Sequence, residues 1–204
     1  MITIVDYDMG NVGSIKNMLE YLGYADVEIS CDKNRILASS HVILPGVGSF
    51  DEGMKNLEIR GLDIILKDYA LNLKKPLLGI CLGMQLLGMS SQEGKKKGLC
   101  LIDFHNIRFN LSNGLKIPHM GWNVVQIKNK ENNLTRDLSN NYRFYFVHSF
   151  HAICRDQSSV LLTTNYGYDV PVAIYDKNIY GVQFHPEKSH HYGMKIFQNF
   201  LGDI

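Results

Sequence analysis

The sequence has almost no net charge, no long hydrophobic run and no secretory signal. Lys and Arg total 21 against 20 Asp and Glu, so the formal net charge is +1. This balance gives no electrostatic reason to expect nucleic acid or a membrane surface as a partner. No apolar segment reaches the roughly 20 residues that a membrane-spanning helix needs. The first residues (MITIVD) lack a basic region and a cleavage site, so we expect no signal peptide.

Cysteine is scarce and unpaired in the sequence. The four cysteines (Cys31, Cys81, Cys100 and Cys154) form no C-x-x-C motif. In a chain without an export signal they are expected to be reduced thiols rather than disulfides or a zinc site. Hydrophobic residues make up 45% of the 204 residues, which is ordinary globular usage. We therefore expect one cytoplasmic domain over residues 1–204, with no metal and no cofactor.

Short apolar runs alternate with amphipathic stretches in the first half of the chain, and this pattern predicts an α/β fold. Strands are expected at 2–6, 41–44, 76–80 and 179–184, and helices after the turn at 10–13, over 57–73, 82–89 and 194–201. From about residue 99 the pattern favours strands joined by polar turns, including 123–127, 142–147 and 160–164. The predicted fold is a mostly parallel central sheet flanked by helices, with additional antiparallel strands.

One cysteine lies in a setting typical of a nucleophile. Cys81 stands between a predicted strand and a predicted helix, inside Gly79-Ile80-Cys81-Leu82-Gly83. This is the nucleophile-elbow arrangement, in which flanking glycines allow a sharp, strained turn. The following helix N-terminus would stabilise a thiolate. The alternative is a buried structural cysteine in a tight turn.

A second motif supplies a base for such a nucleophile. His185 ends the last predicted strand, Pro186 fixes the turn and Glu187 follows. A thiol nucleophile needs a base, and the base needs a group that holds its tautomer and steadies its cation. By itself a His-x-Glu at a strand end is more often a pair of surface residues with no catalytic role. Together with Cys81, it favours a catalytic triad.

A third motif, Pro45-Gly46-Val47-Gly48, follows another predicted strand. Its peptide N–H groups could face a developing oxyanion on the same sheet. Without Cys81, an ordinary glycine loop would be the better interpretation. The Gly-x-x-Gly at 10–13 lacks the full dinucleotide fingerprint and predicts no nucleotide site.

Together these motifs resemble the class I glutamine amidotransferases along the whole chain. Within that family, further segments resemble the glutaminase subunits of imidazole glycerol phosphate synthase. These segments are 44–50, 118–123, 145–150 and 185–189. The resemblance implies a fold, a triad, a glutamine pocket and a docking face.

The resemblance assigns a role to each matching position. Cys81 matches the nucleophile, His185 the general base and acid, and Glu187 the group that orients His185. The positions that match the oxyanion hole are Gly46, Val47, Gly48 and Leu82. Those that match the glutamine contacts are Gly48, Gln85, Ser149 and Phe150, where a Tyr would be familiar in place of Phe150. Those that match the synthase-facing surface are Asn11, Met120, Trp122, Tyr145, His148 and Lys188. From the residues alone, the core is the default place for Trp122.

The implied reaction is hydrolysis of L-glutamine to glutamate and ammonia, which passes to a synthase. Because the glutaminase occupies all 204 residues, the resemblance implies a separate partner, a (β/α)8-barrel cyclase subunit in a heterodimer. The products are then imidazole glycerol phosphate and aminoimidazole carboxamide ribotide, in histidine biosynthesis. The partner is expected to set the loop at 45–48.

Three alternatives stay open at this point. Relatives of the same branch supply ammonia for amidation of a nucleotide-sugar acid in surface polysaccharide synthesis, and residues 11–15 and 189–194 look somewhat like theirs. A hydrolase of other γ-glutamyl compounds would use the same triad. A non-catalytic regulatory module on this fold is a third possibility, against which the intact triad argues.

Overall fold

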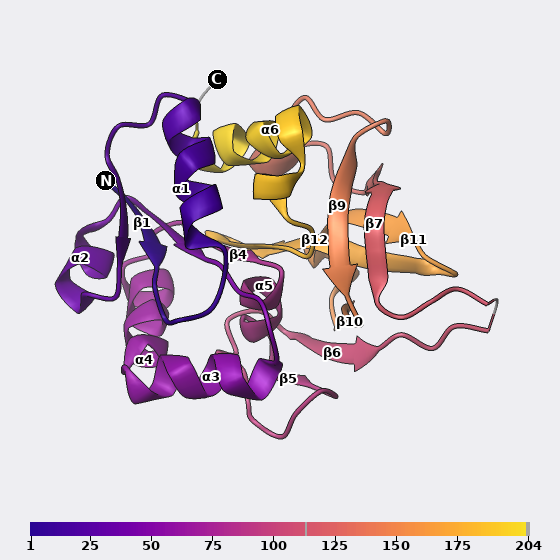
Figure 1. The fold of residues 1–204 in the computed structure, drawn as a ribbon, viewed down its shortest axis with the longest axis horizontal. Helices are drawn as coiled ribbons and strands as arrows, with labels where there is room; N and C mark the ends of the chain where they lie inside the picture. Colours follow the sequence, from indigo (N-terminus) through magenta and orange to yellow (C-terminus); the bar gives the residue numbers. More distant parts are fainter. Residues whose placement is uncertain (113, 203–204) are drawn as a thin grey trace.

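A central eight-stranded sheet organises the molecule (Figure 1). The computed structural model describes residues 1–112 and 114–202. In order across the sheet, the strands are β2 (Val27–Ser30), β1 (Ile2–Val5), β3 (His41–Leu44), β4 (Leu77–Ile80), β13 (Ile179–Val182), β12 (Asp169–Asp176), β11 (Val160–Asn165) and β8 (Gln126–Ile127). The first five are parallel, and β12, β11 and β8 continue the sheet in antiparallel fashion. This is the mostly parallel sheet with antiparallel additions that the sequence predicted.

Two smaller sheets lie beside the central one. A three-stranded sheet pairs β10 (Phe150–Cys154), β6 (Phe104–Arg108) and β5 (Ser90–Ser91). A two-stranded ribbon pairs β7 (His119–Val124) with β9 (Arg143–His148). The helices are α1 (Val12–Tyr21), α2 (Lys33–Ala38), α3 (Phe50–Ile59), α4 (Leu62–Lys67), the π-helical turn η1 (Asp68–Asn72), α5 (Leu82–Leu86) and α6 (His190–Leu201), with short 3-10 turns η2 (Asn133–Thr135), η3 (Gln157–Ser159) and η4 (Pro186–Lys188). No helix among the described residues is both long and apolar enough to cross a membrane.

Alternating side chains of the strands build two cores, one on each face of the sheet. Val42 and Leu44 of β3 pack into the core with α3 and α4, while Ile43 between them joins the core with α1 and α6. Figure 1 shows α1 and α6 above the sheet and α3, α4 and α5 below it. Because strands of a parallel sheet are buried on both faces, they appear in the sequence as continuous apolar runs.

Several boundaries differ from the sequence-based prediction. The helix expected over 57–73 begins earlier, at Phe50, and is interrupted at Gly61, which adopts a left-handed φ of 63°. The strand expected at 123–127 is two strands, β7 and β8, of which β7 begins at His119. The strands β2, β6, β10 and β12 were not predicted at all. Strands β6 and β10 pair with each other across a long separation in the sequence, so local pattern alone does not reveal them.

The fold brings the three predicted motifs to one edge of the sheet. Strands β3, β4 and β13 are parallel neighbours, so their carboxyl ends meet at the same edge. The loop at Pro45 follows β3, Cys81 follows β4, and His185 lies just beyond β13. Ligands of open α/β sheets bind outside this carboxyl edge.

Candidate active site

Cys81 occupies the sharp turn that its glycines predicted. Its backbone has φ 55° and ψ −110°, at the N-cap of α5. A Cβ on Gly79 would lie 2.7 Å from the backbone of Gly83, and one on Gly83 would overlap the carbonyl oxygen of Leu44. These glycines therefore let β4 turn directly into α5, which leaves Cys81 at the edge of the sheet.

His185 and Glu187 form a buried pair beside Cys81. The Nδ1 of His185 lies 2.8 Å from Oε1 of Glu187, and both side chains are almost fully buried. Because a carboxylate can only accept, Nδ1 is the protonated nitrogen. Nε2 of His185 has no hydrogen-bond partner among the described residues. Nε2 is therefore the nitrogen available for proton transfer.

The electrostatic surroundings favour a charged imidazole. Burial by itself would lower the pKa of His185, but its interactions with Cys81 and Glu187 outweigh burial and raise the pKa to about 10. Tyr7 is fully buried nearby, and burial together with the charge of Cys81 raises its pKa well above its ordinary value. Its hydroxyl donates to the carbonyl of Pro45 at 2.6 Å. Tyr7 thus holds the beginning of the loop that faces Cys81.

The loop Pro45-Gly46-Val47-Gly48 lies against the start of α5. The backbone N–H of Leu82 donates to the carbonyl of Gly46 at 3.3 Å. A Cβ at Gly46 would lie 2.7 Å from the backbone nitrogen of Gly83, so only glycine permits this approach. Gly48 has φ 103°, in the region that favours glycine. The expected oxyanion donor at Leu82 is therefore engaged by the loop in this conformation.

A cavity of about 270 Å³ opens over the triad. Its lining includes Cys81, His185 and the positions predicted for glutamine and the oxyanion, namely Val47, Gly48, Leu82, Gln85, Ser149 and Phe150. Gly46, in the same loop, is buried and is not among the lining residues. The structure therefore brings together residues from four distant segments of the chain.

Sequence reasoning missed one acidic residue of this cavity. Glu93 lines it and accepts a hydrogen bond from the backbone N–H of Phe50 at 2.8 Å. That bond caps α3, whose N-cap residue Ser49 provides no side-chain cap of its own. Glu93 lies 43 residues away from Phe50 in the sequence, and its surrounding residues carry no motif that would have indicated this position.

The predicted docking residues lie mainly on the outer face of the β7–β9 ribbon. Met120 is 62% exposed and Trp122 43% exposed, and the Trp122 ring stacks on exposed His190 at 5.5 Å. The Nζ of Lys188 lies 5.8 Å from the centre of the Tyr145 ring. These contacts place Trp122 on the surface rather than in the core.

Two predicted docking positions differ from this outer face. Asn11 is half-buried at the N-cap of α1, on a segment whose Gly10 packs against Pro45. His148 points inward, with only 5% of its surface exposed, because side chains alternate between the two faces of a strand. His148 therefore lines the cavity and is not exposed on the docking face.

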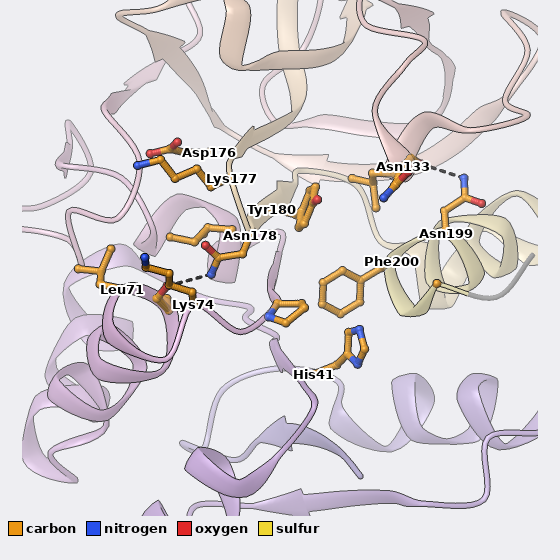
Figure 2. Close-up of a pocket in the computed structure, with 15 residues that line it drawn as sticks. His41, Leu71, Lys74, Asn133, Asp176, Lys177, Asn178, Tyr180, Asn199 and Phe200 are labelled. Atoms are coloured by element: carbon orange, nitrogen blue, oxygen red, sulfur yellow. Dashed lines mark hydrogen bonds between the residues drawn. The ribbon is translucent and has the colours of Figure 1, made fainter.

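A larger cavity of about 620 Å³ lies at the opposite edge of the sheet. In Figure 2, His41, Tyr180 and Phe200 surround its centre, while Asn178 and Asn199 hydrogen bond to the backbone around it. None of the predicted site residues is among the described residues that line it. Cavity size therefore does not single out the candidate active site.

Comparison with known proteins identifies the family. The class I glutamine amidotransferase family matches residues 3–204. A relative from Methanococcus maripaludis, called imidazole glycerol phosphate synthase subunit HisH 2, is 54% identical over 201 residues, with 98% of each chain covered. A Pseudomonas aeruginosa protein of the same name is 42% identical, again with 98% of each chain covered.

Solved structures agree at the level of the fold. A glutamine amidotransferase superposes with a TM-score of 0.74 at 17% identity, covering 99% of this chain and 98% of the other. The structure of PurLQS from Thermotoga maritima gives a TM-score of 0.73 at 20% identity, covering 98% and 97%. The chain belongs to the class I glutamine amidotransferases and, within them, to the family of HisH subunits.

Proposed function

We propose that the chain hydrolyses L-glutamine through Cys81, His185 and Glu187. The observation that carries this proposal is the meeting of a strained cysteine with the buried His185–Glu187 pair under one cavity. An idle site would have no need for a positive φ at Cys81 or for a buried charged pair, since both cost stability. Neither the regulatory module nor the other acceptors considered above are favoured by the relatives' names.

The proposed chemistry proceeds in two halves. The Cys81 sulfur attacks the side-chain amide carbon of glutamine, and a C–S bond forms as the oxygen becomes an oxyanion. His185 gives its Nε2 proton to the leaving nitrogen, the C–N bond breaks, and ammonia departs from a γ-glutamyl thioester. His185 then takes a proton from water, which attacks the thioester and releases glutamate and the thiolate. Glu187 holds the imidazole orientation throughout.

The loop at 45–48 acts as the switch in this scheme. The Leu82 N–H that would stabilise the oxyanion donates instead to the carbonyl of Gly46. The Gly46 C=O and the Val47 N–H belong to one planar peptide and point in opposite directions. Rotating that peptide would release Leu82 and turn the Val47 N–H toward the oxyanion. One such donor contributes roughly 10²–10³ in rate.

We propose that a (β/α)8-barrel cyclase docks on the outer face of the β7–β9 ribbon and forms a heterodimer with the chain in the cytoplasm. The exposed apolar side chains of β7 (Met120, Trp122 and Val124) suit such a contact. The ammonia would serve the synthesis of imidazole glycerol phosphate, as the relatives' names suggest, with aminoimidazole carboxamide ribotide as the second product that the family resemblance implies.

Reconstitution tests this function directly. The purified chain is mixed with an imidazole glycerol phosphate synthase cyclase subunit and its ribotide substrate, and glutamate and imidazole glycerol phosphate are measured together. Equal amounts of both products are expected. Glutamate without imidazole glycerol phosphate would preserve the glutaminase but reject the acceptor, whereas no glutamate at all would reject the function.

A further inference from the structure

A line of hydrogen bonds runs through the interior from the β7–β9 ribbon to the Cys81 sulfur. It begins at Asn123, whose Nδ2 lies 3.3 Å from Nε2 of His119. Nδ1 of His119 lies 2.9 Å from Nε2 of His148, its direct partner across the ribbon. Nδ1 of His148 lies 2.8 Å from the carbonyl oxygen of Phe150. Both histidine side chains are at most 5% exposed.

The same carbonyl continues the line toward the nucleophile. Nε2 of Gln85 lies 3.3 Å from the oxygen of Phe150 and 2.9 Å from Oε1 of Gln183. Nε2 of Gln183 lies 3.7 Å from Sγ of Cys81. Gln183 has no exposed surface. The line therefore joins a strand of the proposed docking face to the reacting sulfur without passing through solvent.

The carbonyl of Phe150 sets the direction of every bond on the histidine side. A carbonyl only accepts, so Nδ1 of His148 must carry the proton. Burial lowers the pKa of His148 to about 3 and that of His119 to about 4, so both rings are neutral near neutral pH. Nε2 of His148 is then an acceptor, His119 donates from Nδ1, and Asn123 donates to Nε2 of His119.

The carbonyl sets the direction on the glutamine side as well. Only the NH₂ group of Gln85 can face the oxygen of Phe150, so its second N–H points to Gln183. The oxygen of Gln183 must accept that bond, which leaves the NH₂ group of Gln183 toward the sulfur. With these bonds in place, the amide of Gln183 cannot exchange its oxygen and NH₂ group without leaving two acceptors or two donors face to face.

We infer that Gln183 donates an N–H to the Cys81 sulfur and stabilises its thiolate, and that His119 and His148 are positioning residues that hold this donor in place through Phe150 and Gln85. The inference rests on the proposed function, since it assigns Cys81 the role of nucleophile. A hydrogen bond to a charged group is about twice as strong as a neutral one. The bond at 3.7 Å therefore matters most when the sulfur is ionised.

The line of hydrogen bonds also begins on a strand that carries proposed docking residues. Met120 and Trp122 alternate with the inward-facing His119, so the docking residues and the buried line share one strand. A partner that shifts β7 would move His119 with it. The line therefore provides a physical connection between the docking face and the nucleophile.

The first experiment titrates the nucleophile in the isolated chain. Iodoacetamide alkylation of Cys81 is followed by peptide mass spectrometry over a range of pH, which separates it from the exposed Cys31 and Cys100. Among the described residues, His185 and Tyr7 are titratable groups that interact with the Cys81 sulfur. Gln183→Leu is expected to raise the alkylation midpoint by about one pH unit. Gln157→Leu removes an amide that donates to the Cys154 carbonyl, and should leave the midpoint unchanged.

An unchanged midpoint in Gln183→Leu would overturn the inference. The second experiment needs no variant that disturbs the fold: ring nitrogen NMR of the wild-type chain at neutral pH. His119 and His148 are both expected to be protonated at Nδ1 and bare at Nε2. A proton at Nε2 of either ring would break the line of hydrogen bonds and reject the inference.

A matched pair of variants tests the histidines as positioning residues. His119→Phe keeps the ring stacking on Phe146 and Tyr166 but removes the donor to His148. It should raise the Cys81 alkylation midpoint in the same direction as Gln183→Leu, by a smaller amount. His151→Phe changes another buried histidine, which pairs with Tyr168 outside the line, and should leave the midpoint at the wild-type value. Equal midpoints in the two variants would reject the positioning role.

These measurements are independent of glutamine turnover. If the wild-type chain and its partner failed to hydrolyse glutamine, the proposed function would fall. The alkylation midpoint and the ring spectra would still decide whether Gln183 donates to Cys81.

Discussion

The backbone N–H of Leu82 donates to the carbonyl of Gly46 at 3.3 Å, which engages the group that we propose to stabilise the oxyanion. We therefore expect the isolated chain to be a slow glutaminase. A partner that rotates the Gly46–Val47 peptide should raise kcat by roughly 10²-fold or more, with a smaller change in KM, because the gain is in transition-state stabilisation.

Steady-state glutamate release, with and without the cyclase and its ligand, measures this effect. The control is the cyclase alone with glutamine, which should produce no glutamate. An isolated chain that already turns over at the rate of the complex would show that Leu82 is not held back by Gly46.

Cys81→Ala should abolish glutamine-dependent turnover, because the thiol is the only proposed nucleophile. The fold should stay intact, because the substitution removes a single sulfur atom from a side chain that is 7% exposed. Turnover by the cyclase from added ammonia should persist, since the acceptor chemistry lies in the partner. Cys154→Ala is the matched control, as Cys154 is also buried but outside the cavity. Residual glutamine hydrolysis by Cys81→Ala would remove the thiol from the mechanism.

The glycines of the elbow can be tested through stability. A Cβ at Gly83 would overlap the carbonyl of Leu44, so Gly83→Ala should destabilise the protein by about 3 kcal/mol. Gly13 in α1 has open space around it, and Gly13→Ala should stabilise the protein by up to about 1 kcal/mol. Urea unfolding of both variants measures the difference. Two equally stable variants would contradict the close approach of β3 and α5.

The predictable parts of this site are the local ones. Glycines at 79 and 83 indicated the elbow because a sharp turn restricts residue type at fixed spacing. Likewise, a proline between His185 and Glu187 marked a turn at the end of a strand. The parallel strands β3, β4 and β13 were visible as apolar runs, since both of their faces are buried.

The parts that sequence could not reveal depend on register and distance. The inward orientation of His148 follows from its pairing with His119 across β7 and β9, and no local pattern encodes that register. The contact between Gln183 and Cys81 joins residues 102 apart in the chain. Strand β6 buries Phe104 and Asn106 and exposes His105 and Arg108, so polar side chains stand at both kinds of position, which hid the strand from a hydrophobic pattern.

The charged state of His185 predicts a pH-dependent contribution to stability. Its pKa is raised from an ordinary 6.5 to about 10 in the folded protein. A group with a raised folded pKa stabilises fully below its unfolded pKa and loses that contribution as the pH rises through the folded value. Glu187→Gln removes a partner that raises the pKa, so its stability deficit should be largest below pH 6.5 and shrink toward pH 10.

Thermal melts of the wild type and Glu187→Gln across this pH range measure the deficit. Glu52→Gln alters an exposed carboxylate paired with Lys55 and should show no such trend. A stability deficit in Glu187→Gln that grew with pH would contradict the predicted direction of the pH dependence.

Trp122 should contribute strongly to partner binding. Its ring is 43% exposed, stacks on His190 and lies 5.9 Å from the guanidinium of Arg143, so it stands as a supported aromatic on an open face. Hot-spot aromatics cost about 2 kcal/mol when truncated, which is roughly a 30-fold loss of affinity. We expect Trp122→Ala to weaken cyclase binding by this factor in calorimetry and to uncouple glutamate release from product formation.

Tyr21→Ala, which truncates a 77% exposed aromatic on α1, should bind like the wild type. Because Trp122 lies outside both cores, the melting temperature of Trp122→Ala should stay near the wild-type value. Normal binding with an earlier melt would instead make Trp122 a packing residue and move the docking face elsewhere.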